Sequence, residues 1–219
     1  MYECRKSFGK NLAKECPADA DIVIPVPDSG VPAALGYSES SGIPFELSII
    51  RNHYVGRTFI QPTQSNRQSS VKLKHNPDRS SIKGKKVVLV DDSIVRGTTS
   101  VKIVQLMREA GASEIHMRIG CPPIKFPDFY GIDTPETEQL LASNKNLEEM
   151  SKFIGADTLG FLSLNGLYKS MGFKEGRSED NPEYTDHCFT GDYPTVLDDY
   201  ESEKVQEQLS LLSENESQN

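Results

Sequence analysis

The sequence contains no tryptophan and only four cysteines, and no apolar run in it is long enough to span a membrane. The cysteines (Cys4, Cys16, Cys121 and Cys188) form no CxxC pair, and the four histidines show no metal-ligand spacing. This pattern predicts neither a disulfide framework nor a zinc site. The residues that follow Met1 lack the apolar core of a signal peptide. We therefore expect a cytoplasmic protein with no membrane partner.

Charge is distributed unevenly along the 219 residues, whose net charge is −8. Residues 196–219 hold seven acids and one base, whereas residues 51–86 hold nine bases and one acid. A basic segment of this kind suits a phosphorylated ligand or nucleic acid, although a merely solvated surface is the simpler interpretation of a charge run taken alone. We expect one domain over residues 1–195, followed by an acidic and largely disordered tail over residues 196–219.

Hydrophobic periodicity predicts strands that alternate with helices. The expected strands cover residues 21–26, 44–51, 85–91 and 114–121, and a late strand followed by a helix covers residues 157–172. The expected helices cover residues 2–15, 31–41 and 98–110, and one or two short helices cover residues 133–155. The nearly continuous apolar run of residues 85–91 is typical of a strand buried on both faces of a parallel sheet. The pattern predicts an α/β fold with a doubly wound, mostly parallel sheet.

One long segment interrupts this alternation. Residues 52–82 show no clean period and are rich in Gln, Ser, Asn, Arg and Lys. We expect a long, flexible, basic loop there, and loops of this length in compact domains often act as lids over a site.

The stretch KKVVLVDDSIVRGTTS (85–100) places two carboxylates, Asp91 and Asp92, where the buried strand ends. Ligands of open α/β sheets bind at the carboxyl ends of the strands. The turn RGTTS (96–100) then opens a helix, whose free N–H groups, dipole and hydroxyl side chains favour an anion. Carboxylates beside a phosphate make sense where they bind sugar hydroxyls or Mg²⁺. A ligand with a 5-phosphate, a vicinal diol and a magnesium-bound pyrophosphate meets all these demands.

Simpler interpretations of the two acids stay open at this point. They could be a helix cap and a surface charge, the acidic pocket of a two-component receiver, or a Walker-B-like pair. No GxxxxGK[ST] motif accompanies them, which disfavours a Walker B site. The stretch from Val88 to Ser100, taken as a whole, is far more specific than a pair of acids alone.

VVLVDDSIVRGTTS resembles the phosphoribosyl pyrophosphate (PRPP) motif of type I phosphoribosyltransferases. In particular, its amino-acid sequence is similar to that of the glutamine phosphoribosylpyrophosphate amidotransferase (amidophosphoribosyltransferase) family, whose members catalyse the first committed step of purine synthesis. Four further stretches carry the same resemblance: IPVPDSGVPAALGY (24–37), RNHYVGRTFIQPTQSNRQSSVKLKHN (51–76), PPIKFPDFYGIDTP (122–135) and FTGDYPT (189–195). Together they extend the resemblance over residues 2–195.

The resemblance implies a role for each matching residue. PRPP would be bound by Asp91, Asp92, Ser93, Arg96, Gly97, Thr98, Thr99 and Ser100. A pyrophosphate loop would consist of Pro27, Asp28, Ser29 and Gly30, and the lid would contribute Arg51, Tyr54, Arg57 and Lys74. Magnesium would be held by Ser29, Asp91 and Asp92. No side chain is expected to act as a nucleophile.

The activity implied by the resemblance is attack of ammonia on the anomeric carbon of PRPP, which gives 5-phosphoribosylamine and pyrophosphate. The transition state should resemble an oxocarbenium ion, with Mg²⁺ and basic side chains stabilising the leaving group. Purine nucleotides are expected as inhibitors, and either a homo-oligomer or a separate glutaminase chain as partner, with no nucleic acid bound. Two alternatives are a salvage phosphoribosyltransferase for purine or pyrimidine bases and a PRPP- or nucleotide-binding module without turnover.

Two departures from the family pattern bear on these expectations. No glutaminase motif surrounds Cys4, so we interpret the chain as the transferase half alone, with its source of ammonia unassigned. Some family members carry an iron–sulfur cluster on cysteines, but the matching positions here hold Asp128 and Thr185, and only Cys188 offers sulfur. Because a cubane cluster normally needs four thiolates, no iron–sulfur cluster is expected.

Overall fold

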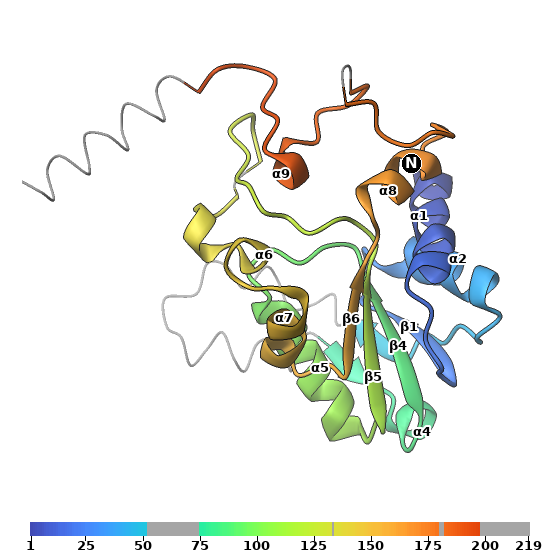
Figure 1. The fold of residues 1–219 in the computed structure, drawn as a ribbon. Helices are drawn as coiled ribbons and strands as arrows, with labels where there is room; N and C mark the ends of the chain where they lie inside the picture. The colour runs from blue at the N-terminus through green and yellow to red at the C-terminus, as the bar shows by residue number, and fades with distance from the viewer. Residues whose placement is uncertain (52–74, 133, 180–181, 198–219) are drawn as a thin grey trace, which may run out of the picture.

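A computed structural model describes residues 1–51, 75–132, 134–179 and 182–197 (Figure 1). The expected lid residues Tyr54, Arg57 and Lys74 lie outside the described residues, as does most of the expected acidic tail. Among the residues that the structure describes, no helix is both long and apolar enough to cross a membrane.

Four parallel strands form the central sheet, in the order β1-β4-β5-β6 (Figure 1). They are β1 (Ile22–Pro25), β4 (Lys86–Asp91), β5 (Glu114–Ile119) and β6 (Thr158–Phe161). Val23 lies opposite Val88 and Leu89 lies opposite Met117, so β4 is paired on both edges. The predicted α/β fold with a mostly parallel sheet is therefore confirmed.

Helices cover both faces of this sheet (Figure 1). The helices α1 (Tyr2–Glu15) and α2 (Val31–Ser41) lie on one face, and α5 (Thr98–Ala110) and α7 (Leu147–Ile154) lie on the other. Residues of β4 alternate between the two layers because successive side chains of a strand point to opposite faces. Val88 and Val90 join the core beneath α1 and α2, whereas Val87 and Leu89 join the larger core beneath α5. The apolar run in the sequence thus reflects burial on both faces.

The expected strand over residues 44–51 is shorter than predicted. Only Ile49–Arg51 forms a strand, β2, which pairs antiparallel with β3 (His75–Pro77). Phe45 makes an isolated parallel bridge to Val23 at the edge of the main sheet instead. Residues 44–51 therefore contact the main sheet through Phe45 and then form part of the two-stranded sheet through β2. The hydrophobic residues of this segment did not indicate that division.

Several short helices complete the described chain: α4 (Arg79–Ile82), η2 (Thr137–Gln139), α6 (Leu141–Asn144), α8 (Leu164–Ser170) and α9 (His187–Thr190). Both β3 and α4 lie inside the segment 52–82 that we expected to be a loop. They are three and four residues long, which is too short to produce a hydrophobic period. The expected short helices in 133–155 and the late strand and helix in 157–172 are confirmed.

Candidate active site

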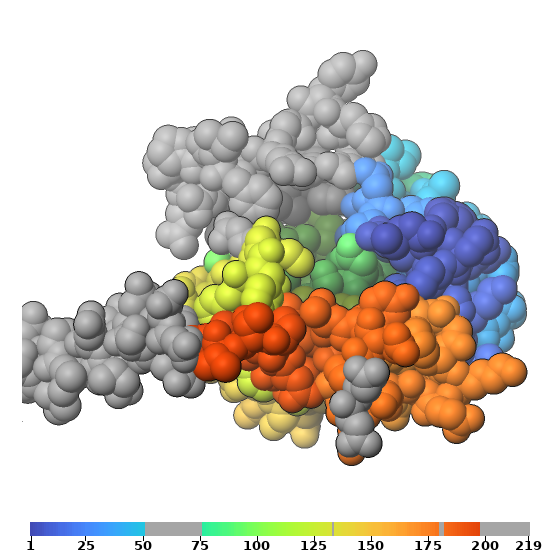
Figure 2. Space-filling view, turned by 90° about the horizontal axis from the view of Figure 1, so that it is seen from above, coloured from blue at the N-terminus to red at the C-terminus, as the bar shows by residue number. Residues whose placement is uncertain are grey.

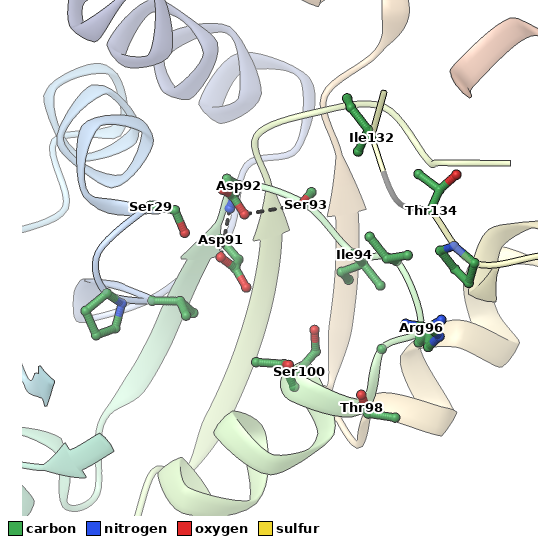
Figure 3. Close-up of a pocket in the computed structure, with 16 residues that line it drawn as sticks. Ser29, Asp91, Asp92, Ser93, Ile94, Arg96, Thr98, Ser100, Ile132 and Thr134 are labelled. Atoms are coloured by element: carbon green, nitrogen blue, oxygen red, sulfur yellow. Dashed lines mark hydrogen bonds between the residues drawn. The ribbon is translucent and has the colours of Figure 1, made fainter. Parts of the chain in front are cut away.

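A cavity of about 650 Å³ opens at the carboxyl ends of β1 and β4 (Figure 3). Its lining comes from three segments: Val26, Pro27 and Ser29 after β1; residues 91–100, which begin with the last residue of β4; and Ile132, Thr134 and Pro135. Figure 2, which looks onto this end of the molecule, shows green atoms from the chain after β4 set back between the blue α1–α2 layer and the yellow-green segment around residue 130. The site lies where the parallel sheet predicts a ligand.

Asp91 is the most unusual ionisable group in this cavity. It is the last residue of β4 and is only 7% exposed. Burial, and secondarily the charge of Asp92, raises the pKa of Asp91 to about 8. The backbone N–H of Asp92 donates a hydrogen bond to Asp91 Oδ1 at 2.9 Å, which only partly offsets that cost. A ligand that brings hydroxyl donors or a cation would stabilise the charged carboxylate.

Side chains with hydroxyl groups lie beside the carboxylates of Asp91 and Asp92. The Ser93 hydroxyl donates to Asp92 Oδ1 at 3.2 Å, and the Ser29 side chain points toward the two carboxylates from the loop after β1 (Figure 3). Two carboxylates and a hydroxyl form the hard oxygen set that suits Mg²⁺. The donor chemistry of Ser29, Asp91 and Asp92 therefore fits a magnesium ion.

The N-terminus of α5 forms the opposite part of the cavity. Gly97 caps the helix in the left-handed conformation, with φ 75° and ψ −7°. The first bond of the helix runs from the Val101 N–H to the Gly97 carbonyl at 3.0 Å, so the N–H groups of Thr98, Thr99 and Ser100 have no intrahelical acceptor. Together with the helix dipole, these donors make the turn a binding site for an anion such as a phosphate.

Only part of the expected pyrophosphate loop faces the cavity. Pro27 and Ser29 line it, whereas Asp28 and Gly30 are not among the lining residues. The Gly30 N–H donates to the Val26 carbonyl at 3.0 Å, and a Cβ at Gly30 would lie 2.5 Å from the Val90 carbonyl oxygen. Gly30 thus lets the loop lie directly against the end of β4.

The remaining expected residues lie less centrally. The Arg96 Nε donates to Gln139 Oε1 at 3.0 Å, so this guanidinium is held at the cavity edge beside η2. Arg51 is the last residue of β2. Ile132, Thr134 and Pro135 were not assigned a role from the sequence, although they lie within PPIKFPDFYGIDTP, the stretch noted for its resemblance.

Comparison with known proteins agrees with this geometry. The phosphoribosyl transferase domain family matches residues 4–121, which include the whole β1-to-β5 core of the site. The chain belongs to the phosphoribosyltransferase family. Its relatives in this family include amidophosphoribosyltransferase of Rhizobium etli, 62% identical over 98% of this chain and 43% of the relative. Amidophosphoribosyltransferase of Bacillus subtilis is 53% identical over 90% of this chain and 41% of the relative.

Solved structures extend the similarity. This chain is similar to the structure of glutamine PRPP amidotransferase from B. subtilis complexed with ADP and GMP. The TM-score is 0.80, and the two are 52% identical over 90% of this chain. This chain covers 43% of that structure. The chain thus corresponds to the phosphoribosyltransferase portion of amidophosphoribosyltransferases and spans less than half the length of these relatives.

The positions that match the family's cluster cysteines do not fit an iron–sulfur cluster. Asp128 and Thr185 supply no sulfur, and Cys188 is a single free thiol. A carboxylate, an exposed threonine and one thiol cannot provide the thiolates that a cubane cluster requires.

Proposed function

We propose that this chain converts PRPP and ammonia into 5-phosphoribosylamine and pyrophosphate. The observation that carries the proposal is one cavity in which two adjacent carboxylates face a helix N-terminus. A phosphorylated sugar is a ligand that needs both features, because its phosphate is an anion and its hydroxyls are donors. The similarity to amidophosphoribosyltransferases supports the choice of reaction.

Different residues of the cavity would bind different parts of the substrate. The N–H groups and hydroxyls of Thr98, Thr99 and Ser100 would bind the 5-phosphate. Asp91 and Asp92 would accept hydrogen bonds from the ribose diol, and those donors would favour the charged form of Asp91. Ser29 would lie beside the pyrophosphate group. This arrangement orients the anomeric carbon while leaving its face open to a small nucleophile.

The chemistry needs no nucleophilic side chain. As the C–O bond to pyrophosphate breaks, the electron pair leaves with that group. The ammonia nitrogen forms the new bond to the anomeric carbon and then releases one proton to solvent. Magnesium, held with Ser29, Asp91 and Asp92, would supply positive charge that neutralises the pyrophosphate. Arg51, Arg57 and Lys74 would add positive charge, and Tyr54 a hydroxyl donor, as the substrate is covered. Their role stays a prediction.

The source of ammonia, the oligomeric state and the cytoplasmic location also stay predictions. Inhibition by purine nucleotides is proposed because a similar structure was solved with ADP and GMP. In the whole enzyme, glutamine would provide the nitrogen through a glutaminase unit that is separate from the phosphoribosyltransferase site.

Pyrophosphate release in the presence of PRPP and Mg²⁺ tests the proposal. Ammonium should support release, and the rate should rise at alkaline pH, where more free NH₃ is present. Purine and pyrimidine bases, tested as a panel, should not support pyrophosphate release. Base-dependent release would identify a salvage enzyme instead, and PRPP binding without any release would identify a binding module.

A further inference from the structure

A second cluster of polar side chains lies outside the PRPP cavity. Asp128 belongs to the segment that follows β5, and His187 and Cys188 belong to α9 near the C-terminal end of the described chain. Figure 2 shows these two parts of the chain, yellow-green and orange-red, lying side by side. The His187 Nε2 atom lies 2.7 Å from Asp128 Oδ1, and both side chains are more than nine-tenths buried. The sequence separation of 59 residues hid this pairing.

We propose that Asp128, His187 and Cys188 bind a divalent cation of the zinc class. Each side chain offers one ligand atom, and the carboxylate oxygen, imidazole nitrogen and thiol sulfur all lie within 4.8 Å of one another. Zinc accepts this mixture of oxygen, nitrogen and sulfur in tetrahedral sites. A site with three protein ligands leaves a fourth position for water or another donor. The proposal departs from our sequence-based expectation that the chain has no zinc site.

The imidazole and the carboxylate present ligand atoms to the same point. His187 Nε2 lies 2.7 Å from Asp128 Oδ1. Nε2 is therefore the imidazole nitrogen that can share a cation with Oδ1, because Nδ1 lies on the other side of the ring. A cation bound there would take the place of the hydrogen bond between Nε2 and Oδ1, and the ring proton would then be on Nδ1.

The carboxylate is positioned before any cation arrives. Asp128 Oδ2 accepts hydrogen bonds from the backbone N–H groups of Tyr130 at 3.0 Å and Ile132 at 2.7 Å. Those bonds hold the carboxylate through Oδ2 and leave Oδ1, which faces His187 Nε2, to bind a cation. Asp128 therefore adds one oxygen to the donor set.

The backbone also ties the two segments together at the cluster. The Cys188 carbonyl accepts hydrogen bonds from the N–H groups of Lys125 at 2.9 Å and Phe126 at 3.1 Å. These bonds hold α9 against the chain that precedes Asp128. The cysteine and the carboxylate thus reach the same point through separate, well-anchored segments.

Aromatic rings shield the cluster from water. The ring of Tyr130 meets His187 edge-on with centroids 5.2 Å apart, and the ring of Tyr193 lies 5.1 Å away, tilted by 30°. The Tyr193 hydroxyl donates to the Pro127 carbonyl at 2.9 Å, which holds that ring in place. A dry, rigid surrounding strengthens metal–ligand bonds and slows the loss of the ion.

The site would brace one wall of the PRPP cavity. Ile132 donates its N–H to Asp128, and Ile132, Thr134 and Pro135 line the cavity. Binding of the cation would release the Cys188 proton to solvent and would replace the hydrogen bond between His187 and Asp128 with bonds to the metal. The cation would therefore link α9 to the cavity wall without taking part in the reaction.

Zinc alone is the probe for the first experiment. The purified chain is treated with a chelator, loaded with ZnSO₄ and desalted, and its metal is counted by elemental analysis. We expect one zinc per chain and a higher melting temperature than that of the chelated protein. Cys4→Ser is the matched control, because Cys4 lies on α1, and it should retain the zinc. Cys188→Ser should lose it. Equal retention by both variants, or no retention by the wild type, overturns the proposal.

Cobalt substitution reports directly which kinds of ligand the cation has. In the wild type and in Cys4→Ser, Co²⁺ should show a thiolate charge-transfer band and the visible bands of a tetrahedral site. An octahedral spectrum without sulfur ligation contradicts the proposal, as does a brown preparation that contains iron and labile sulfide. Asp128→Asn keeps an acceptor for the Tyr130 and Ile132 N–H groups, and it should fold and bind Co²⁺ more weakly. Unchanged cobalt affinity in that variant would remove Asp128 from the site.

Discussion

The backbone N–H of Asp92 donates a hydrogen bond to the Asp91 carboxylate, at 2.9 Å from Oδ1, at the point where β4 ends. The two acids are adjacent in sequence, but they differ in environment. Asp91 is buried, whereas Asp92 is partly exposed to the cavity. The charge on Asp91 is therefore costly, and it is placed where a substrate could stabilise it.

Asp91→Asn should raise the stability of the ligand-free chain. The pKa of Asp91 is raised from 3.8 to about 8 in the fold, so folding favours the neutral form and the charge costs stability at neutral pH. That cost is absent below the unfolded pKa and grows as pH rises. Asparagine is neutral and can still accept from the Asp92 N–H. We expect a melting temperature a few degrees higher at pH 7.5 in chelator, measured by scanning fluorimetry, and no gain at pH 4. A lower melting temperature at pH 7.5 would show that the carboxylate is stabilising.

Asp92→Asn should weaken the use of PRPP while leaving the fold intact. A charge-assisted hydrogen bond to a ribose hydroxyl is worth about 1.5–3 kcal/mol, which corresponds to roughly tenfold or more in kcat/KM. Pyrophosphate release against PRPP concentration measures this. The control is Asp78→Asn, at the cap of α4 away from the cavity, which should keep wild-type kinetics. If the Asp91→Asn/Asp92→Asn double variant kept full activity, the site assignment would be wrong.

Gly97→Ala should damage both stability and phosphate binding. Gly97 has φ 75°, and a Cβ there would lie 2.8 Å from Leu141 Cδ2 and 3.2 Å from the Phe153 ring. The left-handed backbone alone costs a non-glycine residue about 1 kcal/mol, and the contacts would displace the first turn of α5. We expect a loss of stability in denaturant titration and a higher KM for PRPP.

Gly42→Ala separates these two effects. Gly42 is also left-handed, at φ 76°, but a Cβ there would meet nothing within 4 Å. It should lose about 1 kcal/mol of stability and keep its KM. A Gly97→Ala variant whose loss and KM both matched those of Gly42→Ala would mean that the contacts with Leu141 and Phe153 do not matter.

The sequence predicted those parts of the fold that are long and periodic. The helices over 31–41 and 98–110 have the bounds that the structure shows, because each ends at a glycine in the left-handed conformation. The motif at the end of β4 predicted eight lining residues of the cavity, 91–93 and 96–100, because they follow one another closely in the chain. Contacts between distant segments were not predictable in this way. The tertiary fold brings Ile132 to the cavity and His187 to Asp128. The local periodicity of the sequence indicates neither contact.

His116 should make the stability of the chain fall at acidic pH. It is 7% exposed on β5, and burial, followed by the positive charge of Arg118, lowers its pKa below 6.5. The Arg118 Nη1 donates to Thr158 Oγ1 at 2.9 Å, and the Thr158 hydroxyl lies 3.0 Å from His116 Nδ1. Because the Thr158 oxygen already accepts from Arg118, its proton is best directed at the imidazole, which must then be neutral.

The folded state therefore binds the His116 proton less readily than the unfolded state does. The stability that this provides is present above pH 6.5, the unfolded value, and is lost as pH falls toward the lower folded pKa. Glu114 Oε2 lies 3.5 Å from Nε2, which is too far to hold the charged form strongly. His116→Gln, which cannot take up a proton, should flatten the decline in unfolding free energy as pH falls below 6.5, as followed by urea titration. If the variant and the wild type declined with the same slope, another group would be responsible for the acid sensitivity.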